Sequence, residues 1–294
     1  ADAAADGAVW LFSSSQAVAN LLTLLPEQSW VHARAVATHA RLTPHKIGAR
    51  DSRRTLTFAD WNQRATQLAN GLLALGLKKG DRVALLAYNR VEWMEIYTGL
   101  ARAGLVAVPL NFRLMTAEID YILDHSGAVA MIVQDELTER VEPLREKLKL
   151  PSKVFIAMGD QACAGWTPYE QLLADAPLDL PPVEVVPTDM SALMYTSGTT
   201  GQPKGAIRSH EGSSLIALAT ALEMGFTPND TALLVMPMCH ANSLYFSHTF
   251  TQLGATCVID DRKSFDPEIL LATLAADKIT FTSLVPTHYI MMLG

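Results

Sequence analysis

The sequence predicts an α/β protein in which two mostly parallel sheets are flanked by helices. Short apolar segments alternate with helical patterns of ten or more residues, an order typical of parallel βαβ units. A proline-rich stretch, residues 174–189, divides this alternation into two halves, because four prolines suit neither a helix interior nor a central strand. The composition, 49% apolar and 18% charged, is that of an ordinary globular protein.

The elements of the first half follow from periodicity and capping residues. Thr57 and Asp60 form a capping-box pattern that opens a long amphipathic helix, and Gly76 ends it. Expected helices cover residues 30–42, 59–75, 91–103, 116–125 and 136–148, with one more beginning at residues 167–168. Expected strands are a pair within residues 46–58 and single strands at 82–87, 105–109, 128–133 and 153–157.

The second half repeats the pattern. Asp266 and Pro267 are a favourable N-cap and first residue for a helix over residues 268–276. The other expected elements are a helix at 243–253 and strands at 191–196, 231–235, 255–259 and 279–284. The predicted division is an amino-terminal extension (1–29), a first α/β subdomain (30–182) and a second, incomplete α/β subdomain (183–294). The apolar ending at residues 289–293 and the lack of an initial methionine predict a truncated or processed chain.

Charge and cysteine usage exclude several classes of protein. A net charge of -7 argues against a nucleic-acid or anionic-membrane partner. Cys163, Cys239 and Cys257 lie too far apart for a CxxC metal or redox motif. Acidic residues precede the first apolar patch where a signal peptide carries basic ones, and no apolar run reaches the length of a membrane span. We therefore expect a cytoplasmic protein with no integral membrane span.

The segment from Tyr195 to Gly205 carries the strongest chemical pattern in the chain. Glycines let backbone N–H groups approach an anion, hydroxyls add donors, and a lysine adds a positive charge. The residues that would contact phosphate are Thr196, Ser197, Gly198, Thr199, Thr200, Gly201 and Lys204. Residues 191–210 contain no Asp or Glu, although the whole chain is acidic. This loop is therefore a candidate phosphate site.

Other interpretations of the loop fit less well. A flexible Ser/Thr/Gly linker is the alternative that composition leaves open, but strand-like residues enter and leave the segment. The Walker A spacing needs a lysine followed by Ser or Thr and a helix, whereas Lys204 follows Pro203 and precedes a strand-like stretch. No GxGxxG or GxSxG pattern occurs in the sequence, so dinucleotide-binding and serine-hydrolase interpretations lack their main support.

The run Tyr-Thr-Ser-Gly-Thr-Thr-Gly-Gln-Pro-Lys-Gly resembles the signature loop of the adenylate-forming superfamily, which includes acyl-CoA synthetases, luciferases and peptide-synthetase adenylation domains. The stretches at 56–61, 80–84 and 103–111 fall in the order of that superfamily, and residues 237–240 are similar to its second motif. The resemblance covers residues 30–294 and implies the fold of the amino-terminal domain of such an enzyme, here truncated.

The resemblance implies that ATP and a carboxylic acid form an acyl-adenylate, which a thiol such as coenzyme A then attacks. It places Thr196 near Mg²⁺, and residues 197–201 with Lys204 around the β and γ phosphates. It gives His240 a place near the carboxylate, although Cys239 stands where the family usually has an aromatic residue. Lys204 and His240 are thus the candidate catalytic residues.

The acid implied is a medium- or long-chain fatty acid, favoured by the run Asn111-Phe112-Arg113-Leu114, or an aryl acid. The family's later motifs do not occur in this sequence, so we expect the 294 residues to be inactive alone. Two alternatives stay open: an amino-acid adenylation domain, and a non-catalytic nucleotide-binding or interaction module. The protein could also form a homodimer.

Overall fold

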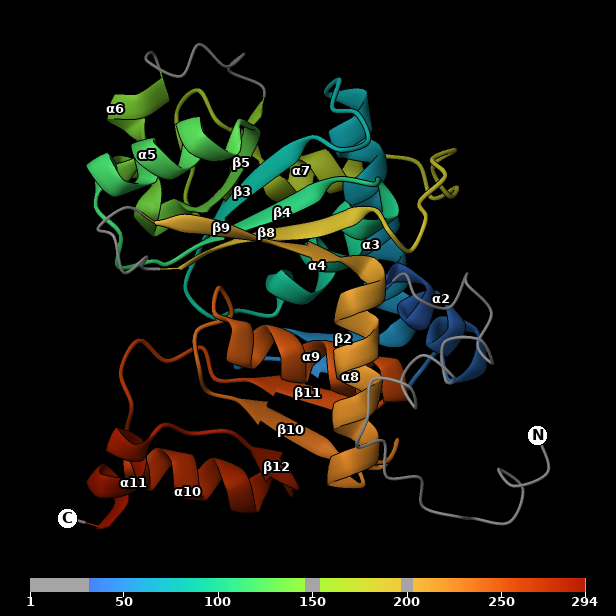
Figure 1. The fold of residues 1–294 in the computed structure, drawn as a ribbon, viewed down its shortest axis with the longest axis vertical. Helices are drawn as coiled ribbons and strands as arrows, with labels where there is room; N and C mark the ends of the chain where they lie inside the picture. Colours follow the sequence, from blue (N-terminus) through green and yellow to red (C-terminus); the bar gives the residue numbers. More distant parts are fainter. Residues whose placement is uncertain (1–31, 146–153, 197–202, 294) are drawn as a thin grey trace.

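The computed structural model describes residues 32–145, 154–196 and 203–293. Within these ranges the larger sheet has seven strands in the order β7-β6-β5-β3-β4-β8-β9 (Figure 1). All its neighbouring strands are parallel except β8 and β9, which are antiparallel. The strands are β3 (Arg82–Leu86), β4 (Val106–Leu110), β5 (Ala128–Gln134), β6 (Phe155–Met158), β7 (Thr167–Pro168), β8 (Met190–Thr196) and β9 (Lys204–Ser209).

The smaller sheet has five described strands in the order β12-β10-β11-β1-β2. Its strands are β1 (Ile47–Arg50), β2 (Thr55–Thr57), β10 (Thr231–Leu234), β11 (Thr256–Ile259) and β12 (Phe281–Thr282). Only β1 and β2 are antiparallel. The predicted class, two mostly parallel sheets with helices, is confirmed. The division at residues 182 and 183 stays a prediction, and strands from both sides of it enter each sheet.

The helices cover the faces of both sheets. They are α2 (His32–Leu42), α3 (Phe58–Ala74), α4 (Glu92–Arg102), α5 (Thr116–Ser126), α7 (Tyr169–Ala174), α8 (His210–Met224), α9 (Ala241–Leu253), α10 (Pro267–Ala276) and α11 (Pro286–Leu293). The capping box predicted from Thr57 and Asp60 is present at the start of α3, and Asp266 caps α10 as predicted.

Several elements differ from the expectation. The helix expected over 136–148 is a 3₁₀ helix, η3 (Asp135–Arg140), followed by the short α6 (Glu142–Arg145), because Pro143 prevents one continuous helix. Residues 146–153 lie outside the described ranges. Residues 167–168 form the short strand β7 instead of starting a helix. Helix α7 begins at Tyr169, and Pro168 is its N-cap residue. Helices α8 and α11 have no counterpart among the expected elements.

A single buried cluster joins the two sheets. Alternate residues of β3 point to opposite faces, so that Val83 and Leu85 enter one core and Ala84 and Leu86 enter another. The first of these cores also contains Ala232 of the smaller sheet together with many residues of α3 and α4. The two sheets therefore share one core around α3 and α4, while α5 covers the outer face of the larger sheet.

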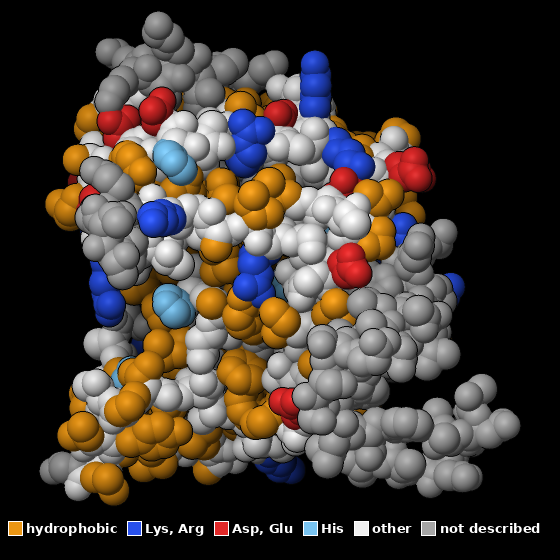
Figure 2. Space-filling model, viewed as in Figure 1, with side chains coloured by type: hydrophobic (Ala, Val, Ile, Leu, Met, Phe, Trp, Pro, Cys, Tyr) orange, Lys and Arg blue, Asp and Glu red, His pale blue; other side chains and the backbone are white. Residues whose placement is uncertain are grey.

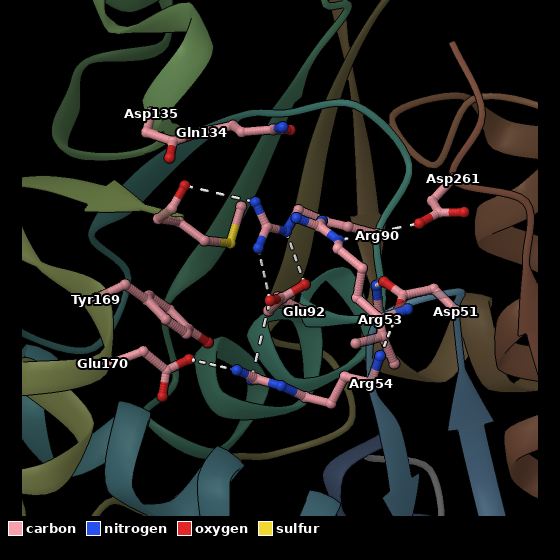
Figure 3. Close-up of polar contacts among 12 residues, drawn as sticks. Asp51, Arg53, Arg54, Arg90, Glu92, Gln134, Asp135, Tyr169, Glu170 and Asp261 are labelled. Carbon is pink, nitrogen blue, oxygen red and sulfur yellow. Dashed lines mark hydrogen bonds and ion pairs between the residues drawn. The ribbon is translucent and has the colours of Figure 1, made fainter. Parts of the chain in front are cut away.

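A group of ion pairs and hydrogen bonds ties the turn after β1 to the start of α4 and to α7 (Figure 3). Arg90 binds Glu92 through two hydrogen bonds of 2.7 Å, and Arg54 bridges Glu92 and Glu170. Asp51 accepts a 2.9 Å hydrogen bond from the backbone N–H of Val91. These contacts fix the start of α4 against the smaller sheet.

The most deeply buried pair of this network joins α3 to α4. Arg64 donates to both carboxylate oxygens of Glu95, at 2.6 and 2.8 Å, and Tyr169 donates to the same carboxylate at 2.8 Å. The Glu95 side chain is fully buried. Because a buried charge is stable only with its partners, the arrangement depends on Arg64.

An apolar surface covers α10 and α11, at the lower left of the molecule (Figure 2). Ile269, Leu271, Tyr289, Ile290 and Met291 are each exposed. Exposed apolar side chains gathered in this way are typical of a surface that packs against further protein.

We predict that Arg64→Leu lowers the free energy of unfolding by about 3 kcal/mol, because it leaves the buried Glu95 carboxylate without its counterion. Urea denaturation monitored by circular dichroism measures the change. Arg34→Leu, on the exposed face of α2, removes the same charge and serves as the control. Equal stability of the two variants would show that the buried pair contributes nothing.

Candidate functional site

The candidate phosphate loop is presented by a β-hairpin. Strands β8 and β9 pair in antiparallel register, and Thr196 and Lys204 form their last pair before the loop. Both residues are exposed. Ser197, Gly198, Thr199, Thr200 and Gly201 lie outside the described residues. The structure therefore places Thr196 and Lys204 opposite each other at the two ends of the loop.

Helix α5 contacts the last residues of β8 and the residue just before β9, on the two sides of the loop. The hydroxyl of Tyr195 on β8 lies 2.7 Å from Nδ1 of His125, and the hydroxyl of Tyr121 donates to the carbonyl of Pro203 at 3.3 Å. The rings of Tyr121 and His125 stack with centroids 5.4 Å apart. One helix thus fixes where the loop begins and ends.

The segment before α9 carries His240, and one asparagine holds that segment in place. Asn89 follows β3 and donates to the carbonyls of Val235 and Met236 at 3.4 and 3.0 Å. Its side-chain oxygen accepts from the N–H of Met238 at 2.7 Å. Asn89 therefore joins the carboxyl end of a strand in the larger sheet to the carboxyl end of β10 in the smaller one.

His240 is exposed and is the N-cap residue of α9. Its side chain makes no capping hydrogen bond, so the first N–H groups of this 13-residue helix have no side-chain partner at the cap. Free N–H groups and the helix dipole favour a negatively charged group such as a carboxylate at this end. The local structure is thus compatible with an acid bound beside His240.

Cys239 precedes His240 and is half-buried. Burial raises the pKa of its thiol to about 11, so at neutral pH it is an uncharged thiol. A neutral, partly enclosed thiol is a weak nucleophile. Cys239 is therefore poorly suited to act as a nucleophile.

A Mg²⁺ ion at this site would be held by oxygen ligands. Within residues 32–145, 154–196 and 203–293 no cluster of three His, Cys, Asp or Glu side chains could hold a metal ion. Mg²⁺ in nucleotide sites is commonly held by phosphates, water and one or two protein oxygens. Thr196, with its exposed hydroxyl at the end of β8, suits the role of one such oxygen. Its assignment to Mg²⁺ stays a prediction.

Two buried imidazoles lie behind the hairpin. His210, the first residue of α8, is only 1% exposed, and His248 of α9 is 9% exposed. Burial lowers the pKa of His210 to about 4, with Asp189 acting to raise it and Lys79 to lower it. Burial also lowers the pKa of His248 to about 3. Both rings are therefore neutral at physiological pH.

The family model described as AMP-binding enzyme matches residues 36–294. A feruloyl-CoA synthase from an Amycolatopsis species is 35% identical over 253 residues, which are 85% of this chain and 48% of the relative. A long-chain-fatty-acid–CoA ligase from Thermus thermophilus is also 35% identical, over 80% of this chain and 43% of the relative.

Solved structures agree with these matches. A fatty acyl CoA synthetase from Mycobacterium tuberculosis has a TM-score of 0.79 and 28% identity, and the match covers 91% of this chain and 51% of that one. An anthranilate CoA ligase, at 24% identity, shares the fold with a TM-score of 0.85. The chain therefore belongs to the AMP-binding, or adenylate-forming, enzyme family, and it corresponds to the amino-terminal region of these enzymes. It spans about half the length of the curated relatives it matches.

Sequence reasoning found the loop and His240 but not the residues that position them. Asn89, Tyr121 and the contact of His125 were missed, since each acts on a partner more than 69 residues away. Asn89 stands directly after an expected strand, and a polar residue at that place was the one available signal.

No helix within the described residues is both long and apolar enough to span a membrane.

We predict that Asn89→Ala lowers the free energy of unfolding by about 2 kcal/mol, because it leaves the partly buried backbone groups after β10 without partners. Thermal and urea denaturation measure the loss. Asn70→Ala is the matched control, since Asn70 also donates to two carbonyls, at 2.8 Å each, but at an exposed position. A loss no greater than that of the control would contradict the bridging role.

We predict that acid destabilises the protein partly through His210. The pKa of His210 is about 4 in the folded protein and near its ordinary value of 6.5 in the unfolded chain. Between these values the unfolded chain binds more protons, so the free energy of unfolding falls as the pH falls, by about 2 kcal/mol at pH 5. Urea midpoints measured across this range should fall less steeply in His210→Gln, and unchanged steepness would refute the assignment. His45→Gln, an exposed histidine, is the control.

Proposed function

We propose that this chain contributes the phosphate-binding hairpin of an ATP-dependent acid-thiol ligase, which converts a carboxylic acid to its acyl-adenylate and then to the coenzyme A thioester. Membership of the AMP-binding family supports the reaction class. The observation that carries the proposal is the pairing of Thr196 with Lys204 at the mouth of a Gly/Ser/Thr loop. Residues 197–201, which the structure leaves undescribed, complete the phosphate contacts in this proposal.

The electrostatics of the hairpin suit a departing diphosphate. Residues 190–210 contain Lys204 and Arg208 and no carboxylate, and the carboxylate just before them, Asp189, is neutralised by Lys79 at 2.7 Å. Charge accumulates on the leaving oxygens during transfer at phosphorus, so fixed donors and an unpaired cation lower the barrier. Lys204 supplies the cation, and Thr196 supplies a hydroxyl near Mg²⁺.

We assign His240 and the start of α9 to the carboxylate of the acid. The exposed N-cap position and the uncapped N–H groups of α9 favour a negative charge there. His240 in this proposal orients the carboxylate for attack on the nucleotide. Among the described residues, no hydrogen bond or ion pair links His240 to Thr196 or Lys204, so the substrates themselves span the distance between them.

For the acid we propose a medium- or long-chain fatty acid, with an aryl acid as the second candidate. The relatives that match at equal identity are named for long-chain fatty acids and for ferulate, which is an aryl acid, and this supports keeping both. Acid-dependent exchange of labelled pyrophosphate into ATP, measured on the full-length gene product, tests the choice. Exchange with amino acids only would favour an adenylation domain, and ATP binding with no exchange would favour a non-catalytic module.

We predict that Lys204→Ala slows adenylate formation by about 10²-fold or more in the full-length protein, because one preorganised charge is lost at the transition state. Thr196→Ala should slow it by a similar factor. Single-turnover assays of acyl-AMP formation measure both effects. Lys78→Ala removes an exposed lysine elsewhere on the molecule and serves as the control. An unchanged rate in both loop variants would remove the hairpin from the reaction.

A further inference from the structure

A small cavity with a mostly apolar lining and a few polar side chains lies between α4, α8, α9 and the strands β8 and β9. We name it the α8–α9 cavity. Its volume is about 20 Å³, which is room for one oxygen-sized group. The lining residues that carry the argument are Arg208, His210, Leu244 and His248.

Two of these side chains, one buried and one half-buried, carry buried nitrogen atoms that lack hydrogen-bond partners among the described residues. Neither ring nitrogen of His210 has a partner, although the residue is 1% exposed. Nη2 of Arg208 is likewise buried and unpartnered. An unsatisfied buried donor destabilises the folded protein, so a bound acceptor at this place would be favoured.

The cavity also carries uncompensated positive charge. The guanidinium group of Arg208 lies over the ring of Tyr245, 4.3 Å from its centroid, and forms no ion pair within the described residues. The nearby carboxylate of Asp189 is already paired with Lys79. A guanidinium group only donates hydrogen bonds, so the missing partner is an acceptor.

Helix α9 and strand β9 each run from the cavity to one of the proposed reaction groups, His240 and Lys204, so their geometry gives the distances. His240, Leu244 and His248 follow one face of α9 at intervals of four residues, which places His248 about 12 Å from His240 along the helix. Lys204 and Arg208 are four residues apart on β9, or about 13 Å. An extended chain advances about 1.2 Å per bond, so these distances correspond to about ten bonds.

We propose that the α8–α9 cavity receives an oxygen-bearing substituent at the far end of the carboxylic acid, and that Arg208 and His210 donate hydrogen bonds to it. This inference rests on the proposed function, since it places the reacting carboxylate beside His240. Leu244, between the two ends, contacts the aliphatic part of the acid. The class of substrate is thus a medium-chain acid with a terminal hydroxyl or a second carboxylate.

The test uses the full-length protein with decanoic acid, its ω-hydroxy derivative and the corresponding α,ω-dicarboxylic acid. We expect kcat/KM for pyrophosphate exchange to be about tenfold or more higher for at least one substituted acid, because a site built to hydrogen-bond oxygen discriminates against an analogue without it. A preference for the hydroxy acid would assign recognition to hydrogen bonding, and a preference for the dicarboxylic acid to the charge of Arg208. Either result supports the inference.

Arg208→Met should bring the ratio of substituted to unsubstituted acid close to one, because it keeps an unbranched side chain over Tyr245 but removes the donors. Arg41→Met, an exposed arginine on α2, should keep the wild-type ratio. The wild-type measurement stands even if the variant fails to fold. Exchange with decanoic acid at a rate equal to or above that of both substituted acids would overturn the inference and leave the proposed function intact. The absence of exchange with any carboxylic acid would overturn both.

Discussion

The three hydrogen bonds of Asn89 are the contact on which the candidate site depends. They satisfy two carbonyls and one N–H of the segment between β10 and α9, and so hold that segment against the end of β3. Because backbone groups at a strand end have no sheet partner, a side chain must supply one. The carboxyl ends of strands from both sheets therefore meet, as is usual for ligand sites in α/β proteins. His240 comes directly after this junction in the chain.

The hairpin of β8 and β9 positions the second part of the candidate site, the residues at the two ends of the phosphate loop. Antiparallel pairing places Thr196 opposite Lys204, and α5 fastens the neighbouring Tyr195 and Pro203. The hairpin carries cations and no carboxylates, so it is locally positive and favours a phosphate group, although the whole chain has a net charge of -7. An acidic protein can in this way hold a highly charged nucleotide without attracting nucleic acid.

Much of the fold could be predicted from the sequence because its signals are local. The capping box at Thr57, the Asp266–Pro267 start of α10 and the alternation of strand and helix each depend on neighbouring residues. Helix α8 escaped prediction because its buried face consists of small and polar residues such as Ser213, Ser214 and Ala217, which give little apolar periodicity. The sequence also did not predict that each sheet contains strands from both predicted subdomains. Strand β1 pairs with β11 about 200 residues away, and no local pattern indicates such a pairing.

The candidate site divides in the same way. Thr196, Lys204 and His240 were found because each belongs to a recognisable run of residues. Asn89 and Arg208 act through tertiary contacts, so nothing beside them in the sequence reveals their partners. The most direct test of the account is a crystal structure of the full-length protein with Mg²⁺ and a non-hydrolysable ATP analogue. The account predicts that the β and γ phosphates lie within hydrogen-bonding distance of the Thr196 hydroxyl and the Lys204 ammonium group. Phosphates bound elsewhere, with both side chains turned to solvent, would contradict it.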